Sequence, residues 1–298
     1  MIRTLYRYGS FVQCTGAEFT LPFAFAAMAV AARQNRGWPG WRTFLLILAG
    51  MTCAHAFALG FELIVARKFS VPGPTRTNGN CTAGNSPVGF ALAMSLLGGA
   101  GLVLAGYFLN RLCFYLAPIA LGLVCFSLLS NRFTNFTHLF RGFTVALAPV
   151  GAWLAVKGEN LNATELVQLT VFTGALVLWA AGFDIVYSLP DYEFDRVRRT
   201  GSLAVAWGPA NALAAAFIAH MLCSGLLLVF GLIAGFRIAH LTGWTIIVGC
   251  FVLEHWIARR RSLGWINSAF RRLNAVASTV FLVTTIAEVV FAGGFRLR

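Results

Sequence analysis

The chain has 298 residues, of which 58% are hydrophobic and only 11% are charged. This balance excludes an ordinary soluble globular protein and indicates an integral membrane protein. The formal net charge of +13 does not require a nucleic-acid partner, because positive-inside bias and attraction to anionic membrane lipid account for much of it.

Nine stretches of the chain are apolar over about the 20 residues that a membrane-spanning helix needs. The seventh stretch is interrupted by Pro209, Asn211 and His220. The sequence predicts an all-α polytopic membrane protein in which residues 1–298 form a single integral membrane domain. In chain order, the predicted spans cover residues 18–35, 42–66, 87–108, 112–130, 139–157, 165–187, 203–233, 239–259 and 271–293.

The distribution of basic residues predicts the orientation of the chain. With nine spans, the N-terminus and the loops after the even-numbered spans share one face, which carries 15 of the 23 lysines and arginines. The positive-inside rule places this face in the cytoplasm. The same face holds the long connection at residues 67–86, whose length indicates a function. Residues 1–16 are typical of a short basic, aromatic segment that lies at the membrane interface.

All three aspartates of the chain lie within the stretch GFDIVYSLPDYEFDRVRRTGS, residues 182–202. Asp184, Asp191 and Asp195 are spaced i, i+7 and i+11, which places them on one stripe of a helix, and Pro190 predicts a kink or a break. A carboxylate deep in a bilayer costs about 2.5–3.5 kcal/mol, so a cation is expected nearby. Mg²⁺ prefers oxygen ligands and often bridges to phosphate. A solvated loop that pairs with the arginines following it is the alternative.

The same stretch resembles the second aspartate motif of the UbiA superfamily of intramembrane aromatic prenyltransferases. Nine spans with functional loops after the even-numbered spans also suit this family. The C-terminal part is similar to the menaquinone and ubiquinone branch. The resemblance extends over nearly the whole chain and is carried further by FTLPFAF at 19–25, SNRFTNFTHLFRG at 130–142, LAPVGAWLAVKG at 147–158 and LEHWIARRRSLGWINSAFRRLN at 253–274.

The resemblance implies transfer of a prenyl group from a polyprenyl diphosphate to a hydroxybenzoate- or naphthoate-like aromatic acid in quinone biosynthesis. It implies a helical bundle around a central cavity open to lipid, in the inner (cell) membrane of a bacterium. Two acidic motifs, after the second and sixth spans, would hold Mg²⁺ against the diphosphate. By this likeness Asp191 and Asp195 are metal ligands. Asp184, Tyr187 and Asp191 are the expected catalytic residues, and Arg132 would contact the diphosphate.

The first acidic motif departs from the family pattern. Relatives typically carry N-x-x-x-D-x-x-x-D at the end of the second span. In the corresponding stretch FELIVARKFSVPGPTRT, residues 61–77, these three positions hold Glu62, Ala66 and Ser70. The first motif therefore lacks both of its aspartates.

Two interpretations of this departure remain open. In the first, the enzyme is active with fewer metal ions: Glu62 supplies one carboxylate, and Arg67, Lys68 and Arg76 bind the diphosphate directly. In the second, the chain has lost prenyl transfer and binds a prenyl lipid or quinone, or acts as the partner of an active relative. A secondary transporter is a third class, disfavoured because its charged site should lie near the midplane, whereas these acids lie at one mouth.

Other polar residues within the spans have two interpretations each. His138, His220 and His255 either contact a ligand or form hydrogen bonds between helices. Glu288 lies toward the non-cytoplasmic end of the last span, far from the acidic stripe, so we expect it outside the site.

Overall fold

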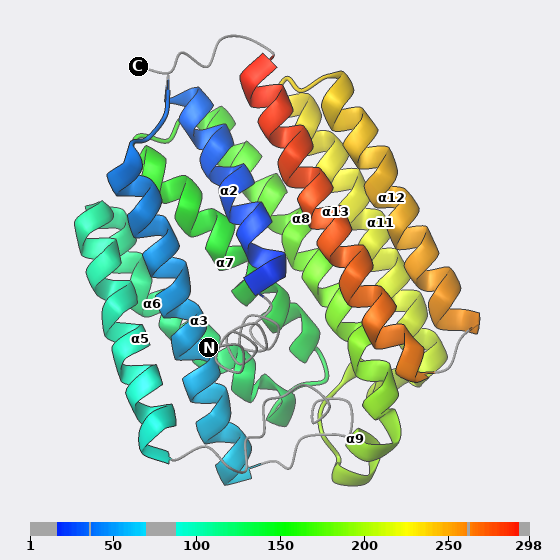
Figure 1. Ribbon diagram of the computed structural model, residues 1–298. Coiled ribbons are helices and arrows are strands. Elements are labelled where there is room, and N and C mark those ends of the chain that lie inside the picture. Colours follow the sequence, from blue (N-terminus) through cyan, green and yellow to red (C-terminus); the bar gives the residue numbers. More distant parts are fainter. Residues whose placement is uncertain (1–16, 36, 70–87, 261–262, 292–298) are drawn as a thin grey trace, which may run out of the picture.

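The computed structural model describes residues 17–35, 37–69, 88–260 and 263–291. These residues form helices and connections and contain no strand, as the sequence predicts (Figure 1). The long helices are α2 (Ala17–Gln34), α3 (Trp41–Phe69), α5 (Val88–Leu109), α6 (Arg111–Leu129), α7 (Thr137–Lys157), α8 (Ala163–Ser188), α11 (Pro209–Ile233), α12 (Ile238–Arg260) and α13 (Leu263–Phe291).

Eight of the helices in the described part of the chain are long and apolar enough to cross a membrane. They coincide with the second to ninth predicted spans. The first predicted span is present as α2 but does not belong to this set, because Glu18 near its start and Arg33 and Gln34 at its end make its sequence more polar. The protein is thus an integral membrane protein built from a helical bundle. The orientation predicted from the basic residues stays a prediction.

Helix α2 lies inside the bundle and packs against α7 and α13. Its Phe23 is only 1% exposed, and its ring lies 4.7 Å from that of Trp179, 5.4 Å from that of Phe281 and 6.4 Å from that of Phe172. Such aromatic clusters bury large apolar areas and hold helices in a defined arrangement. The aromatic cluster around Phe23 therefore packs α2 against α8 and α13 in the central core.

Helices α7 and α8 approach each other closely at Gly142. A Cβ atom at this position would lie 2.4 Å from the carbonyl oxygen of Val177, a distance that real side chains do not adopt. Glycine therefore permits the close contact between the two helices. The contact lies one turn from the polar side chains at the start of α7, which it brings against α8.

The end of α8 changes geometry where Pro190 predicts a break. A 3₁₀ turn, η2 (Leu189–Asp191), follows α8 directly, and a short helix, α9 (Tyr192–Arg198), continues the chain. Arg199 ends α9 in a left-handed conformation with φ of 53°. The kink is confirmed, and it lies between Asp184 and Asp195.

The seventh predicted span consists of two helices. A short helix, α10 (Leu203–Trp207), ends at Gly208, whose φ is 82°, and α11 begins at Pro209. Proline suits the first helical position because its missing N–H has no partner there. The prediction of one span from 203 to 233 was therefore too long at its start.

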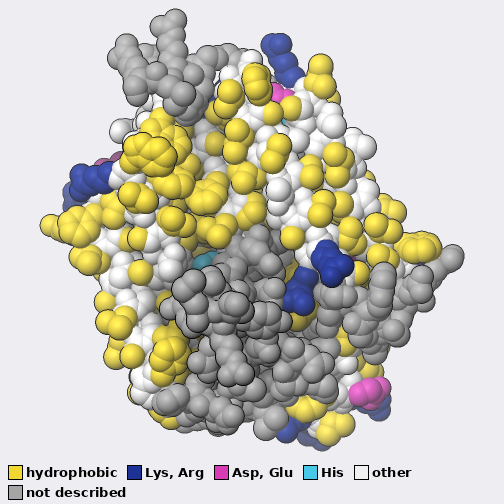
Figure 2. Space-filling model, viewed as in Figure 1, with side chains coloured by type: hydrophobic (Ala, Val, Ile, Leu, Met, Phe, Trp, Pro, Cys, Tyr) yellow, Lys and Arg dark blue, Asp and Glu magenta, His cyan; other side chains and the backbone are white. Residues whose placement is uncertain are grey.

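The outer surface of the bundle is apolar along the lengths of the helices. Figure 2 shows hydrophobic side chains spread over the visible face, with lysines and arginines mainly toward its edges and ends. On α5, for example, Leu96, Leu97, Leu104 and Tyr107 are each more than half exposed. An exposed apolar surface of this extent is typical of contact with membrane lipid.

Candidate active site

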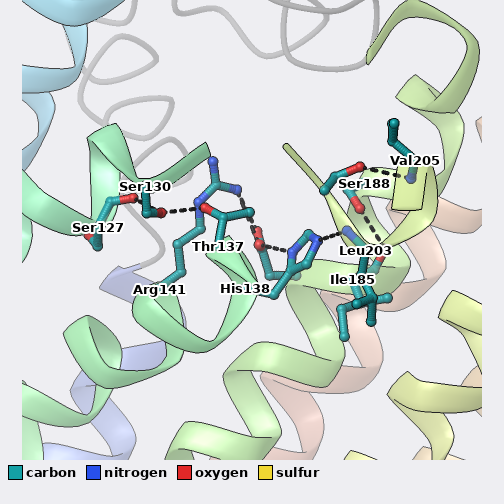
Figure 3. A network of polar contacts seen from close by, with 11 residues as sticks. Ser127, Ser130, Thr137, His138, Arg141, Ile185, Ser188, Leu203 and Val205 are labelled. Atoms are coloured by element: carbon teal, nitrogen blue, oxygen red, sulfur yellow. Dashed lines mark hydrogen bonds and ion pairs between the residues drawn. The ribbon is translucent and has the colours of Figure 1, made fainter. Parts of the chain in front are cut away.

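The start of α7 is attached to α8 by two side chains that contact Asp184. Arg141 donates through one nitrogen, Nη1, to both carboxylate oxygens, at 2.9 and 3.1 Å. His138 lies one turn earlier on α7, and its Nδ1 is 2.5 Å from Oδ2 of the same carboxylate (Figure 3). The side chains of Arg141 and Asp184 are 25% and 18% exposed. The ion pair is therefore mostly withdrawn from solvent without being sealed off.

The hydrogen bonds of His138 indicate which of its two ring nitrogens carries the proton. The backbone N–H of Leu203, at the start of α10, donates to Nε2 at 3.4 Å. Because Nε2 accepts this bond, the network assigns the ring proton to Nδ1, which then donates to Asp184. His138 thus connects the carboxylate on α8 to the backbone that follows α9.

Asp191 and Asp195 continue the acidic stripe beyond the end of α8. Asp191 closes the 3₁₀ turn and Asp195 lies in α9, and both are buried, at 3% and 6% exposure. Four residues apart, they lie on one face of a helical segment. Asp184 precedes Asp191 by seven residues, or about 10 Å of helical rise, so it lies deeper in the bundle.

Glu62 lies on α3, and its side chain is exposed. The guanidinium group of Arg141 interacts electrostatically with Glu62 and Asp195 as well as with Asp184. Carboxylates on α3, α8 and α9 therefore all contribute to the electrostatic environment of Arg141, and Asp184 is the one in contact with it. Glu62 of the first motif and the aspartates of the second are therefore near enough to the same arginine to interact with it electrostatically.

Tyr187 and Arg132 lie in the elements that border this centre. Tyr187 is half-buried on α8, one turn beyond Phe183, and the two rings stack with centroids 5.7 Å apart. Its i, i+3 spacing places it on the Asp184 side of the helix. Arg132 is exposed and lies in η1 (Ser130–Arg132), between α6 and α7.

The remaining predicted diphosphate ligands cannot be placed beside this centre. Arg67 and Lys68 belong to the last turn of α3, but their side chains lie outside the described residues, and so does the whole of Arg76. Their binding roles stay predictions.

The donor set of Asp191 and Asp195 fits a hard cation. Their carboxylate oxygens are the ligands that Mg²⁺ prefers, and Mg²⁺ typically takes one or two carboxylates together with waters and substrate phosphates. Within the described residues, no group of three or more acidic, histidine or cysteine side chains could hold a metal ion. The two aspartates therefore suit a metal whose coordination is completed by a ligand.

The loops on either side of the site are joined through their backbones. Gly201, after α9, donates its N–H to the carbonyl oxygen of Asn131 in η1 at 2.7 Å. A Cβ atom on Gly201 would lie 2.5 Å from the carbonyl oxygen of Thr134. Asn131 contributes to this contact through its main chain, which any residue supplies.

Arg141 is the site residue that sequence reasoning missed. The sequence counted it among the basic residues of the cytoplasmic face and gave it no contact with an aspartate. The sequence did contain a signal. Arg141 lies near the start of an apolar predicted span, within SNRFTNFTHLFRG, and a cation inside a membrane needs a partner of opposite charge.

The other intramembrane polar residues serve contacts between helices. His220 is fully buried on α11; its Nδ1 lies 3.1 Å from Nε2 of His255 on α12, and its Nε2 lies 3.3 Å from the carbonyl oxygen of Trp179. Oε1 of Glu288 accepts the backbone N–H groups of Arg237 and His240 at the start of α12, at 2.8 and 3.0 Å. Glu288 thus caps α12 and lies outside the acidic site, as expected.

Apolar helices around a group of buried carboxylates define an integral membrane protein with a charged site at one mouth of its bundle. The chain belongs to the UbiA prenyltransferase family, whose model matches residues 20–278. The resemblance seen in the sequence is confirmed.

Individual proteins show the same likeness. A relative from Paraburkholderia phytofirmans, a 4-hydroxybenzoate octaprenyltransferase, is 24% identical over 251 residues, which cover 83% of this chain and 84% of the relative. The apo structure of a UbiA homolog from Aeropyrum pernix K1 matches with a TM-score of 0.80 and 22% identity, over 92% of this chain and 98% of that one. A UbiA homolog from Archaeoglobus fulgidus, bound to GPP and Mg²⁺, matches with a TM-score of 0.64 and 17% identity, over 93% and 99%.

Proposed function

We propose that the protein transfers a prenyl group from a polyprenyl diphosphate to a hydroxybenzoate- or naphthoate-like acid in quinone biosynthesis. The observation that carries this proposal is the group of Asp184, Asp191 and Asp195, the last two of them buried, at one mouth of an apolar bundle, with the basic side chain of Arg141 beside it. Support comes from the family, from the relative that acts on 4-hydroxybenzoate, and from the homolog bound to GPP and Mg²⁺.

The charged mouth suits binding of the diphosphate. Asp191 and Asp195 would hold Mg²⁺, which when bound neutralises charge on the departing diphosphate. Arg132 would donate to diphosphate oxygens from the loop between α6 and α7, together with Arg67, Lys68 and Arg76. Placing positive groups where negative charge develops is the main electrostatic contribution that such a site offers.

The chemistry at the acceptor requires an oriented ring and little water. The bond between the first prenyl carbon and the diphosphate oxygen breaks, and a ring carbon of the acceptor bonds to that prenyl carbon. The ring then loses a proton, which would pass to the departing diphosphate. Asp184 lies deeper than the metal-binding aspartates and is fixed by His138 and Arg141. It would orient the acceptor together with Tyr187, while the apolar helices exclude water and accept the prenyl tail.

A second candidate function is binding of a prenyl lipid or quinone without transfer. The observation that favours it is the absence of aspartate at positions 66 and 70, which hold Ala66 and Ser70. We prefer the enzyme because Asp191 and Asp195 are buried acids whose carboxylate oxygens are the ligands that Mg²⁺ takes beside a phosphate group. That reasoning applies to a cation site in either case, so product formation must separate the two.

The test uses protein purified in detergent or nanodiscs. It is incubated with a labelled long-chain prenyl diphosphate, Mg²⁺ and a panel of hydroxylated benzoic and naphthoic acids. We expect a prenylated product with at least one acid. No product from folded protein that still binds the prenyl diphosphate would favour the binding function and overturn the proposed one.

A further inference from the structure

Arg141 carries a positive charge within the site, and the mechanism proposed above uses this side chain only to fix Asp184. Its guanidinium group is hydrogen-bonded to Asp184 and interacts electrostatically with Glu62 and Asp195. One cation thus contacts Asp184 and interacts electrostatically with two carboxylates from other elements. A metal ion placed between the two acidic motifs would meet a similar set of charges, but here the positive charge belongs to the chain itself.

The geometry of the pair leaves part of the guanidinium group available to a ligand. Arg141 uses Nη1 alone to reach both oxygens of Asp184, so the pair is not the two-nitrogen fork that arginine and carboxylate often form. Among the described residues, Asp184 is the only hydrogen-bond partner of this side chain, and a quarter of its surface is exposed. Nη2 and Nε can therefore donate to an incoming anion.

The charges around the site favour a permanent cation here. The first motif lacks carboxylates at Ala66 and Ser70, which are the positions that would help to hold a second metal ion. Glu62, Asp184 and Asp195 remain; Asp195 is buried and Asp184 is 18% exposed, and carboxylates withdrawn from water are stabilised by a nearby positive charge. A guanidinium group supplies positive charge without metal ligands and matches the geometry of phosphate oxygens.

We propose that Arg141 is a built-in cation of the diphosphate site, so that the protein binds one Mg²⁺, at Asp191 and Asp195, instead of two. Arg141 takes the place of the second ion and donates to the diphosphate. This inference rests on the proposed function, because it assumes that a diphosphate occupies the site. Arg141 would thus supply the positive charge that a second metal ion would otherwise bring, in a chain whose first motif lacks both aspartates.

The experiment counts metal ions directly and does not depend on turnover. Mn²⁺, whose binding is followed by electron paramagnetic resonance, is titrated into the purified protein with saturating inorganic pyrophosphate. We expect one Mn²⁺ per chain in the unaltered protein. Two ions would overturn the inference while leaving the proposed function intact. No Mn²⁺ and no pyrophosphate binding would instead contradict the proposed function.

Substitutions then test Arg141 itself. In Arg141→Gln we expect either a second Mn²⁺ ion or at least a tenfold loss of pyrophosphate affinity, whereas Arg141→Lys should retain one ion and an affinity within a few-fold. An unchanged count and affinity in Arg141→Gln would assign the residue a structural role and overturn the inference.

Arg111→Gln is the matched control, because Arg111 is exposed at the start of α6 and lies over the ring of Tyr115. If Arg141→Gln does not fold, the metal count of the unaltered protein decides.

Discussion

At the scale of single residues, the carboxylate of Asp184 is positioned by donors from a neighbouring helix. His138 donates from Nδ1 only because its Nε2 accepts the N–H of Leu203. The orientation of Asp184 therefore depends on a side chain that itself contacts neither the diphosphate nor the metal in the proposed mechanism. His138 is thus a positioning residue.

This role predicts a difference between two substitutions of His138. The amide nitrogen of His138→Asn can replace Nδ1 as the donor to Asp184, whereas His138→Leu cannot. A hydrogen bond to a charged group contributes about 1.5–3 kcal/mol, so His138→Leu should lower kcat/KM by roughly 10- to 100-fold. Steady-state kinetics with both substrates check this. Equal losses of kcat/KM in the two variants would contradict a role for the hydrogen bond from residue 138 to Asp184.

A second ion pair joins α7 and α8 at the end away from the site. Nζ of Lys157 lies 2.6 Å from Oε1 of Glu165, both side chains are buried, and Asn162 caps the start of α8 beside them. Lys157→Met should lower stability by about 3–5 kcal/mol, because it leaves a buried carboxylate unpaired. Unfolding of the detergent-purified protein measures the effect. The double variant Lys157→Met/Glu165→Gln should recover part of it, and no recovery would contradict the paired-charge explanation.

At the scale of elements, the site depends on how closely α7 approaches α8. The contact at Gly142 brings the first turns of α7 against the end of α8, where Arg141 meets Asp184. The aspartates continue through a 3₁₀ turn into α9, so Asp191 and Asp195 lie beyond the end of α8 and are still buried, while Asp184 lies within α8. Helix packing therefore determines which charges meet.

Gly142→Ala tests this packing. Its Cβ would lie 2.4 Å from a backbone oxygen of α8, so α7 must shift, and we expect a loss of about 1–3 kcal/mol in stability together with lower activity. Gly151→Ala on the same helix is the matched control, because no atom lies within 4 Å of the added Cβ. Thermal unfolding in detergent compares the two. A stable, active Gly142→Ala protein would contradict the importance of the contact.

Sequence reasoning succeeded for features that are local along the chain. The lengths of apolar runs predicted the helices, and Pro190 predicted the change of helix geometry after Ser188. The contact between Arg141 and Asp184 could not be predicted, since it joins residues 43 positions apart and depends on the rotation of α7 against α8. Pro209 was noted as an interruption of the seventh span, but the span was still predicted to be continuous because α10 and α11 are both apolar.

At the scale of the whole molecule, the protein combines an apolar exterior with a charged site at one end of the bundle. We propose that this end, with the N-terminus and the loops after the even-numbered predicted spans, faces the cytoplasm of a bacterium whose inner membrane holds the protein. The distribution of lysine and arginine, 15 on this face and 8 on the other, supports the orientation.

Labelling of introduced cysteines tests the orientation. Glu193 is exposed on α9 and Glu159 is exposed after α7, so the proposed topology puts them on opposite sides of the membrane. We expect a membrane-impermeant thiol reagent to label Glu193→Cys only from the cytoplasmic side and Glu159→Cys only from the other side. The unaltered protein gives the background from its native cysteines. Labelling of both positions from one side would contradict the topology.

The measurement that tests the central claim most directly is Mg²⁺-dependent formation of a prenylated aromatic acid, compared between the unaltered protein, Asp191→Asn and Glu193→Gln. Asp191 is buried in the proposed metal site, whereas Glu193 is an exposed acid two residues away. We predict product that requires Mg²⁺, is lost at least 100-fold in Asp191→Asn and is unchanged in Glu193→Gln. Product of equal yield in all three proteins, or product that does not need Mg²⁺, would contradict the account.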